Sequence, residues 1–220
     1  MAQKIILSKT ARPELAAYIE SLGYEVVPFG PIDNVQEPLK YHPDMVFCRL
    51  DRDTVYAGDP SKLRPQYPGD IVYNACSTGK HFIHNLKYTA PELLRAAEQH
   101  NLATIHVSQG YAKCSTCVVG EDAIITYDRG IARAAETAGM DVLTIRPGHV
   151  ELPGYDTGFI GGATGLLTGP TSENTRPILI FNGDLSAHPD WRAIEDFAAE
   201  HGVEVKYFSG WKLTDIGSII

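Results

Sequence analysis

Two aspartates, Asp156 and Asp215, lie in glycine-rich or apolar segments, where ionised side chains are uncommon. Asp215 interrupts the C-terminal stretch WKLTDIGSII, whose apolar residues are typical of a buried strand. Burying a carboxylate costs free energy unless a cation or hydrogen-bond donors compensate it. Both residues are therefore candidates for binding a guanidinium, an amine or a metal ion. The alternative is a structural carboxylate that accepts hydrogen bonds from backbone amides at a turn.

Two histidine-containing segments add further candidates. His42 and Asp44 lie in YHPDM, and because His-Pro-Asp is typical of turns we favour a turn there over a ligand site. His84 and Asn85 interrupt KHFIHNLKY, where strand alternation places them on opposite faces. A lone histidine usually has a structural role, so catalysis by His84 is the less favoured interpretation.

Cys114 and Cys117 form a CxxC motif, which raises the possibilities of redox chemistry and metal binding. A redox CxxC opens a helix, whereas this motif runs into the predicted hairpin CVVGEDAIIT. A zinc site needs a second close pair, and Cys48 and Cys76 are isolated in the sequence. We therefore favour two structural cysteines, with one buried and one facing the centre of the fold. Cys114 with His84 as a nucleophile–base pair is the alternative.

The segment GGATG (161–165) resembles a phosphate-binding loop but lacks the helix and the Lys-Ser/Thr that such a loop requires. Its glycines instead predict a close approach of two backbones. We accordingly predict no cofactor and no metal site from these spacings.

Composition limits the classes of function. The chain has 220 residues, a formal charge of −8 and no Lys/Arg cluster, which argues against general nucleic-acid binding. No apolar run approaches the length of a membrane helix, and no signal peptide opens the chain, so a cytoplasmic location is expected. The four cysteines are expected to be reduced there. The acidic net charge is compatible with a cationic small molecule as the partner. The sequence does not determine the oligomeric state, and an oligomer is possible.

Four stretches of the chain follow one pattern, in which a helix ends at Gly or Asn and a short strand follows. They are PELAAYIESLGYEVVPF (13–29), PELLRAAEQHNLATIHV (91–107), GIARAAETAGMDVLTI (130–145) and PDWRAIEDFAAEHGVEVKYF (189–208). The predicted helix ends are Gly23, Asn101, Gly139 and Gly202. The repeated unit predicts an α/β fold.

Strand pairs precede these helices. Segments 46–57 and 117–126 are predicted hairpins with acidic turns, and 158–167 is predicted to pair with 178–183 across a surface loop at 168–177. PGDIVYNA (68–75) is interpreted as a strand in a further copy of the repeated unit, one that has lost its helix. The unit is therefore β-β-α-β.

The predicted helix ends are 78, 38 and 63 residues apart, which fits a period of about 40 if the third step contains the extra loop, and the step from the last unit around to the first is 41 residues. The first unit, beginning at KIILSK, lacks a leading strand that LTDIGSII can supply from the other end of the chain. We predict one domain over residues 1–220, a ring of five units closed by pairing of its two ends. The alternative is an ordinary α/β sandwich.

This architecture resembles the pentein fold of the guanidino-group-modifying enzymes, which include arginine deiminase, dimethylarginine dimethylaminohydrolase and the amidinotransferases. GYAKCSTCVV, LPGYDTGFIGGATG and LTDIGSII also resemble an uncharacterised bacterial family assigned to that fold. The resemblance implies a site on the fivefold axis, where the enzymes use a cysteine nucleophile, a histidine and acidic residues.

The chain departs from the enzyme motifs at two positions. Asp215 stands where the terminal motif L-T-C-x-S has its cysteine, and Gly154 stands where H-L-D-T has its histidine. Asp156 and Thr157 match the second motif, and Asp44 is similar to the acidic residue of the first strand. A carboxylate is a poor nucleophile toward a guanidinium carbon, so the usual covalent mechanism is not expected.

We expect a protein that binds a small cationic or guanidino/amide ligand on the axis. If it is an enzyme, it is a hydrolase or transferase of C–N bonds. The alternatives are a non-catalytic binding or scaffold protein and a metal-assisted hydrolase that uses axial Asp and His residues. The catalytic candidates are Asp156, Asp215, Cys114 and His84. The ligand-binding candidates are His42, Asp44, Asn85, Lys113, Tyr155 and Thr157.

Overall fold

The structure, a computed structural model, describes residues 3–169 and 176–220. The four predicted helices are present as α1 (Pro13–Ser21), α2 (Pro91–Gln99), α4 (Arg129–Thr137) and α5 (Trp191–Glu200). Each buries apolar residues at helical spacing, as Leu15 and Ile19 do in α1. The chain leaves each helix through a residue with positive φ, as predicted: Gly23 (92°), Asn101 (56°), Gly139 (84°) and Gly202 (73°).

The strands are short. They are β1 (Lys4–Ser8), β2 (Glu25–Phe29), β3 (Phe47–Arg49), β4 (Val55–Ala57), β5 (Cys76–Ser77), β6 (His81–His84), β7 (Ala103–His106), β8 (Thr116–Gly120), β9 (Ala123–Thr126), β10 (Asp141–Thr144), β11 (Thr164–Leu167), β12 (Ile178–Phe181) and β13 (Glu204–Lys206). The remaining helical elements are α3 (Ala112–Ser115) and the 3₁₀ turns η1 (Glu37–Tyr41), η2 (Pro43–Met45), η3 (Pro60–Lys62), η4 (Gly161–Ala163) and η5 (Leu185–Ala187).

Within the described residues the strands form five small sheets, so the protein is a mixed α/β fold. The sheets β5-β6-β7, β8-β9-β10 and β11-β12-β13 each join an antiparallel pair to a parallel third strand that follows a helix. β1 and β2 pair in parallel across α1, whereas β3 and β4 form an antiparallel hairpin without a helix. The predicted β-β-α-β order therefore holds in three sheets.

The predicted hairpins at 46–57 and 117–126 and the pairing of 158–167 with 178–183 are confirmed as β3–β4, β8–β9 and β11–β12. Of the predicted loop 168–177, residues 170–175 lie outside the described residues. The predicted strand at 68–75 is wrong, because this segment forms turns, one of them bonded from Asn74 N to Ile71 O at 2.8 Å. Ile71 and Tyr73 are apolar because they are fully buried, not because they belong to a strand.

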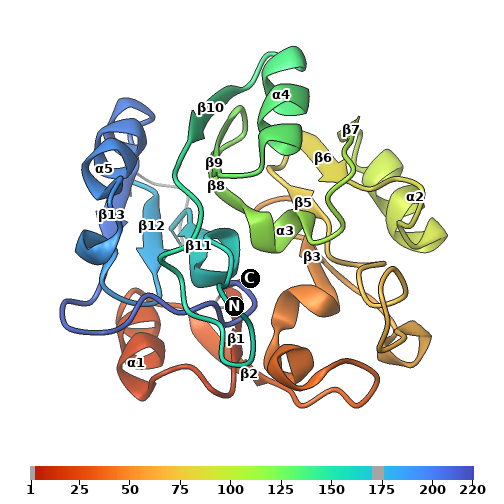
Figure 1. The fold of residues 1–220 in the computed structure, drawn as a ribbon, viewed down its shortest axis with the longest axis horizontal. Coiled ribbons are helices and arrows are strands. Elements are labelled where there is room, and N and C mark those ends of the chain that lie inside the picture. Colours follow the sequence, from red (N-terminus) through yellow and green to blue (C-terminus); the bar gives the residue numbers. More distant parts are fainter. Residues whose placement is uncertain (1–2, 170–175) are drawn as a thin grey trace.

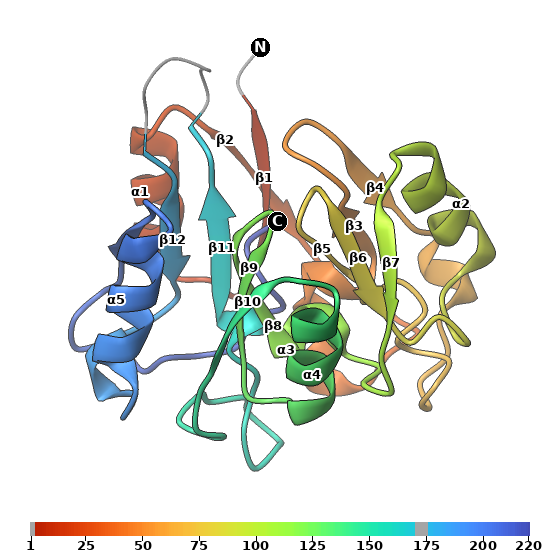
Figure 2. The same ribbon diagram turned by 90° about the horizontal axis from the view of Figure 1, so that it is seen from above.

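Figure 1 shows how these elements are arranged. α1, α2, α4 and α5 lie around the rim of the view, whereas β1, α3 and the C-terminus lie near its centre. In the perpendicular view of Figure 2, β11 and β12 run side by side, with α1 and α5 outside them. No helix in the described part of the chain is both long enough and apolar enough to cross a membrane.

The C-terminal segment pairs with β1 near the N-terminus. Ile6 N donates to Ile220 O at 2.5 Å, and Ile220 N donates to Ile6 O at 3.1 Å. On its other side, Ile219 N donates to Thr164 O of β11 at 3.0 Å. The predicted regular strand at 213–220 is nevertheless interrupted, because Gly217 and Ser218 have positive φ values of 73° and 71°. In this segment Thr214 makes a parallel bridge to Glu151.

The apolar core is divided among the sheets. One cluster combines β1 and α1 with β12 and the C-terminal segment through residues such as Ile5, Leu15, Ile180, Ile216 and Ile219. Because residues from both ends of the sequence share this cluster, each end is buried only when the other is in place.

Candidate functional site

Four predicted site residues meet in a buried polar cluster near the middle of the fold. His42 and Asp44 lie at η2, Cys114 lies in the single-turn helix α3, and Asp215 lies in the C-terminal segment. Their exposed fractions are 3 %, 0 %, 2 % and 3 % respectively. The sequence had favoured a plain turn at 42–44, and the turn is present, but its side chains point inward to this cluster. We call these four residues the buried cluster.

Asp44 connects the other members. Its Oδ2 accepts hydrogen bonds from Cys114 Sγ at 3.1 Å and from Ser218 Oγ at 2.6 Å. Among the described residues, Asp44 Oδ1 is buried and has no hydrogen-bond partner, and neither has His42 Nδ1. The distance from His42 Nδ1 to Asp215 Oδ1 is 3.7 Å, too long for a hydrogen bond. The cluster therefore holds two unsatisfied polar atoms.

Asp215 is bound by backbone amides, as the structural alternative predicted. Phe159 N donates to Oδ2 at 3.0 Å, and Gly217 N donates to Oδ1 at 2.9 Å. Burial raises the pKa of Asp215, an effect that the charge of Asp44 strengthens and that His42 and the two amides oppose. Each oxygen thus accepts one backbone hydrogen bond, the arrangement expected of a structural carboxylate.

Cys114 lies in the single-turn helix α3, directly before the strand β8 that carries Cys117. Asn74 Nδ2 donates to its Sγ at 3.2 Å. Burial, followed by the nearby charges of Asp44 and Asp215, raises the pKa of Cys114 well above its usual value. Cys117 lies on β8, where burial raises its pKa to about 11. All four cysteines are free thiols, and Cys114 has little thiolate character for nucleophilic attack.

Lys113 links the buried cluster to a cavity. Its Nζ donates to Ser218 Oγ at 3.0 Å and to Gly161 O at 3.3 Å, and its side chain also lines a cavity of about 420 Å³. We call this the central cavity, because each of the five sheets and the C-terminal segment contribute to its wall. Representatives of these six segments are Ile5, Cys48, Ser77, Val119, Gly165 and Ile219.

Two cations at the central cavity lack acidic partners. Arg49 donates to Arg52 O at 2.9 Å and to Lys4 O at 3.3 Å, and burial lowers its pKa. Within the described residues neither Arg49 nor Lys113 has a carboxylate within 4.0 Å. Asp44, Asp156 and Asp215 do not line this cavity. Asp51 and Glu121 line the cavity together with Arg49, Arg52 and Lys113, so its wall carries both charges, and Arg49 and Lys113 are cations without a close carboxylate.

His84 and Asn85 lie outside the buried cluster. The His84 ring is fully buried, with Nε2 3.1 Å from Gly110 O and Nδ1 2.7 Å from Thr89 Oγ1. Asn85 Nδ2 donates to Ser108 O at 3.1 Å. Because both residues bind neighbouring loops, and the side-chain bonds of Cys114 go to Asp44 and Asn74, the structure does not bring Cys114 and His84 together as a pair.

Protonation of His84 should make the protein acid-sensitive. Burial lowers its pKa from 6.5 to about 4, so the unfolded chain binds this proton first as the pH falls. Stability from this group is complete above pH ~6.5 and should fall by about 2.5 kcal/mol between pH 7.5 and pH 4.5. Urea unfolding of wild type and His84→Gln at both pH values measures this difference. Equal pH dependence in the two proteins would contradict the prediction.

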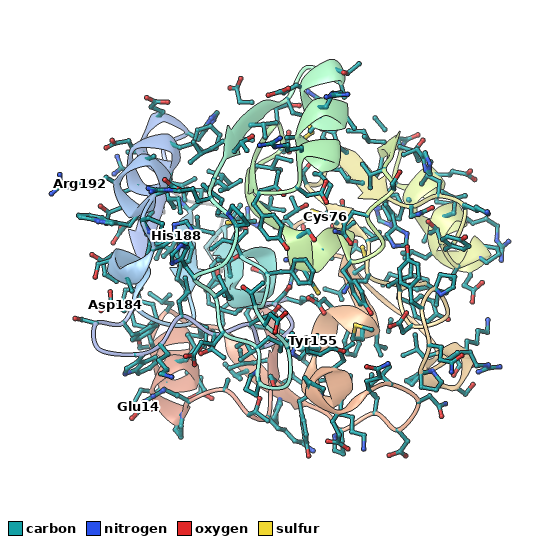
Figure 3. All side chains as sticks on the ribbon, viewed as in Figure 1. Glu14, Cys76, Tyr155, Asp184, His188 and Arg192 are labelled. Atoms are coloured by element: carbon teal, nitrogen blue, oxygen red, sulfur yellow. The ribbon has the colours of Figure 1, made fainter. Side chains whose placement is uncertain are left out.

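Tyr155, Asp156 and Thr157 lie together in a different place, the loop 148–157, where they line a second cavity of about 630 Å³ with Glu151. Asp156 is exposed, and Tyr155 Oη donates to Gln36 Oε1 at 3.0 Å. In Figure 3 Tyr155 lies near the middle of the view, well inside the rim where Glu14 and Arg192 are labelled. Asp156 is thus exposed, whereas Asp44 and Asp215 are buried.

The sequence analysis missed three residues of these sites. Ser218 and Asn74 hold Asp44 and Cys114, and Arg49 lines the central cavity. Ser218 belongs to a stretch that was interpreted as a buried strand, so its polar side chain was a signal comparable to that of Asp215. Arg49 interrupts the apolar stretch VFCRL and carried a similar signal, whereas Asn74 carried none, because it lies in a segment of mixed polarity.

Residues 55–220 match the family of unknown function DUF6873. No curated protein matches the chain. The family match includes β4 and every later element, with Lys113, Cys114 and the C-terminal segment. Because this range is most of the sequence, the chain belongs to the DUF6873 family.

Proposed function

We propose that the protein is a pentein-like ring that binds a small organic ligand on its central axis. The five separate sheets, the rim helices and the two hydrogen bonds between Ile6 and Ile220 support a ring closed by its own ends. In a ring of this kind the space enclosed by the sheets is a natural ligand site.

The central cavity is the observation that carries this proposal. Its volume of about 420 Å³ lies within the range of small-molecule sites, and its wall combines apolar side chains with a few polar groups. A ligand there would contact all five sheets at once. Ligand binding should therefore stabilise the whole fold, not one unit of it.

Two cations of the cavity wall that have no close carboxylate, Lys113 and Arg49, favour a ligand with an acidic group. Lys113 uses two of its three protons on Ser218 and Gly161, which leaves one for a ligand. Arg49 adds a second cation without an acidic partner. The cationic ligand expected from the sequence needs Asp44, Asp156 and Asp215 at one site, and these residues do not line this cavity.

We propose binding, not covalent catalysis. The resembling enzymes need a thiolate and a histidine on the axis, whereas this chain has Asp215 and Gly154 at those motif positions. Both Asp215 oxygens accept backbone hydrogen bonds, and Cys114 is a protonated, buried thiol. The free thiols also support a proposed location in the reducing cytoplasm.

Replacing Lys113 with methionine should weaken ligand binding by about 30-fold, because a charged hydrogen bond of about 2 kcal/mol is lost. The measurement is a thermal-shift screen with small carboxylates and phosphate esters, followed by titration of each compound that stabilises the wild type. Lys9→Met, at an exposed lysine, is the matched control and should bind as the wild type does.

The same screen should include amines, guanidines and ureas. Stabilisation by guanidines alone, lost in Asp156→Asn and kept in Lys113→Met, would move the site to the second cavity. Stabilisation by none of these compounds would contradict small-ligand binding as the function.

A further inference from the structure

We propose that His42, Asp44 and Cys114 bind one thiophilic divalent cation, with zinc as the best match to their donor atoms. This site is separate from the central cavity and does not depend on a ligand there. The inference rests on the geometry of the three side chains, on their unsatisfied atoms and on the charges around them.

The three side chains are close enough to share an ion. One imidazole nitrogen of His42, one carboxylate oxygen of Asp44 and Sγ of Cys114 lie within 4.8 Å of one another. Tetrahedral zinc with bonds of about 2.0 to 2.3 Å holds such atoms about 3.5 Å apart. Side-chain rotations that move these three atoms by about 1 Å would therefore complete the site without movement of the backbone elements.

The unsatisfied atoms of the cluster point to a missing partner. Among the described residues, seven buried side-chain atoms have no hydrogen-bond partner, and two of them, His42 Nδ1 and Asp44 Oδ1, belong to this set of three residues. Each such atom costs free energy when it is buried without a partner. A cation would accept lone pairs from the imidazole and the carboxylate and remove this cost.

The donor set selects the kind of ion. A thiolate, an imidazole and a carboxylate together suit zinc, whereas magnesium and calcium prefer oxygen ligands alone. The second shell is already in place, since Ser218 Oγ donates to Asp44 Oδ2 at 2.6 Å and Asn74 Nδ2 donates to Asp44 O at 3.1 Å. Three protein ligands leave the fourth position open.

Charge and protons balance in the loaded site. When the ion binds, Cys114 releases its thiol proton to solvent, and its hydrogen bond to Asp44 is replaced by two bonds to the cation. The thiolate and the Asp44 carboxylate then neutralise the two positive charges. Asp215 keeps the two backbone amide hydrogen bonds that hold its carboxylate.

Because the site is buried, the ion should enter while the chain folds. The test is to unfold the full chain with a chelator and a reductant, and to refold it with Co²⁺, with Zn²⁺ or without metal. We expect one equivalent of metal per chain, a thiolate-to-cobalt charge-transfer band, and a melting temperature about 5 °C higher with Zn²⁺.

Cys114→Ala should lose the band and the thermal shift, whereas Cys117→Ala, which removes another fully buried thiol, should keep both. Asp44→Asn should bind metal at least tenfold more weakly. Wild-type protein that refolds without bound metal, a band or a shift would overturn the proposal, even if a variant failed to fold. A band that persists in Cys114→Ala would also overturn it, because the thiolate would then be another cysteine.

Discussion

A chain ended at Ser218 should fail to fold cooperatively. Ile219 and Ile220 are 4 % and 2 % exposed, and their loss removes two buried side chains at about 2 to 4 kcal/mol each. Their backbones also make the hydrogen bonds to Thr164 and Ile6. The combined cost of at least ~5 kcal/mol is comparable to the whole stability of a typical domain.

Circular dichroism on heating and urea unfolding measure this effect. The double variant Ile219→Val, Ile220→Val is the control, because it keeps the backbone and should cost only about 2 kcal/mol in total. A shortened chain that melts cooperatively within 5 °C of the wild type would show that the joined ends contribute little.

Gly161→Ala should destabilise the protein by more than ~3 kcal/mol, because the added methyl group has no space. A Cβ at this position would overlap the carbonyl oxygens of Lys113 and Thr116, which belong to the backbone. Gly161 O itself accepts a hydrogen bond from Lys113 Nζ, which also donates to Ser218 Oγ. Neither side of the contact can move without breaking the network that supports Asp44.

Gly120→Ala is the matched control, since the nearest atom to its added Cβ is Ala123 Cβ at 3.9 Å. We expect a change within about 1 kcal/mol there. Urea unfolding of both variants gives the comparison. Similar free energies of unfolding for the two variants would mean that the chain relaxes around residue 161, contrary to the prediction.

Local patterns were sufficient for the helices and hairpins. Leu15 and Ile19 repeat at helical spacing, and Gly23 or Asn101 follows the helix because those residues tolerate positive φ. Local patterns gave the wrong result at 68–75. Ile71 and Tyr73 are spaced as on one face of a strand, but they are buried side chains of a segment that forms turns. Burial depends on which elements pack against a segment, and the periodicity of that segment carries no information about them.

The candidate site could be predicted only in part. Asp44 was a candidate through its similarity to the acidic residue of the enzymes' first strand, and Asp215 was recognisable as a polar residue in apolar surroundings. The structure brings both into one cluster with Cys114. Asp156 had the same signal but lies in an exposed loop, because the motif around it carries no information about its distance from the C-terminus. Ser218 pairs with Asp44 across 174 residues, and such a contact is set by the tertiary fold alone.

The pairing of Ile6 with Ile220 also has a consequence for synthesis. Domains begin to fold from the N-terminus while the ribosome is still adding residues. Here β1 and Asp44 emerge early, yet their partners at Ile220 and Ser218 follow much later, Ser218 by 174 residues after Asp44. The side of β1 and the Asp44 side chain that the C-terminal segment covers therefore remain exposed to water until translation has passed Ile220. We expect closure to be a late step, because it joins residues far apart in the sequence, and Ile5 and its neighbours stay exposed until then.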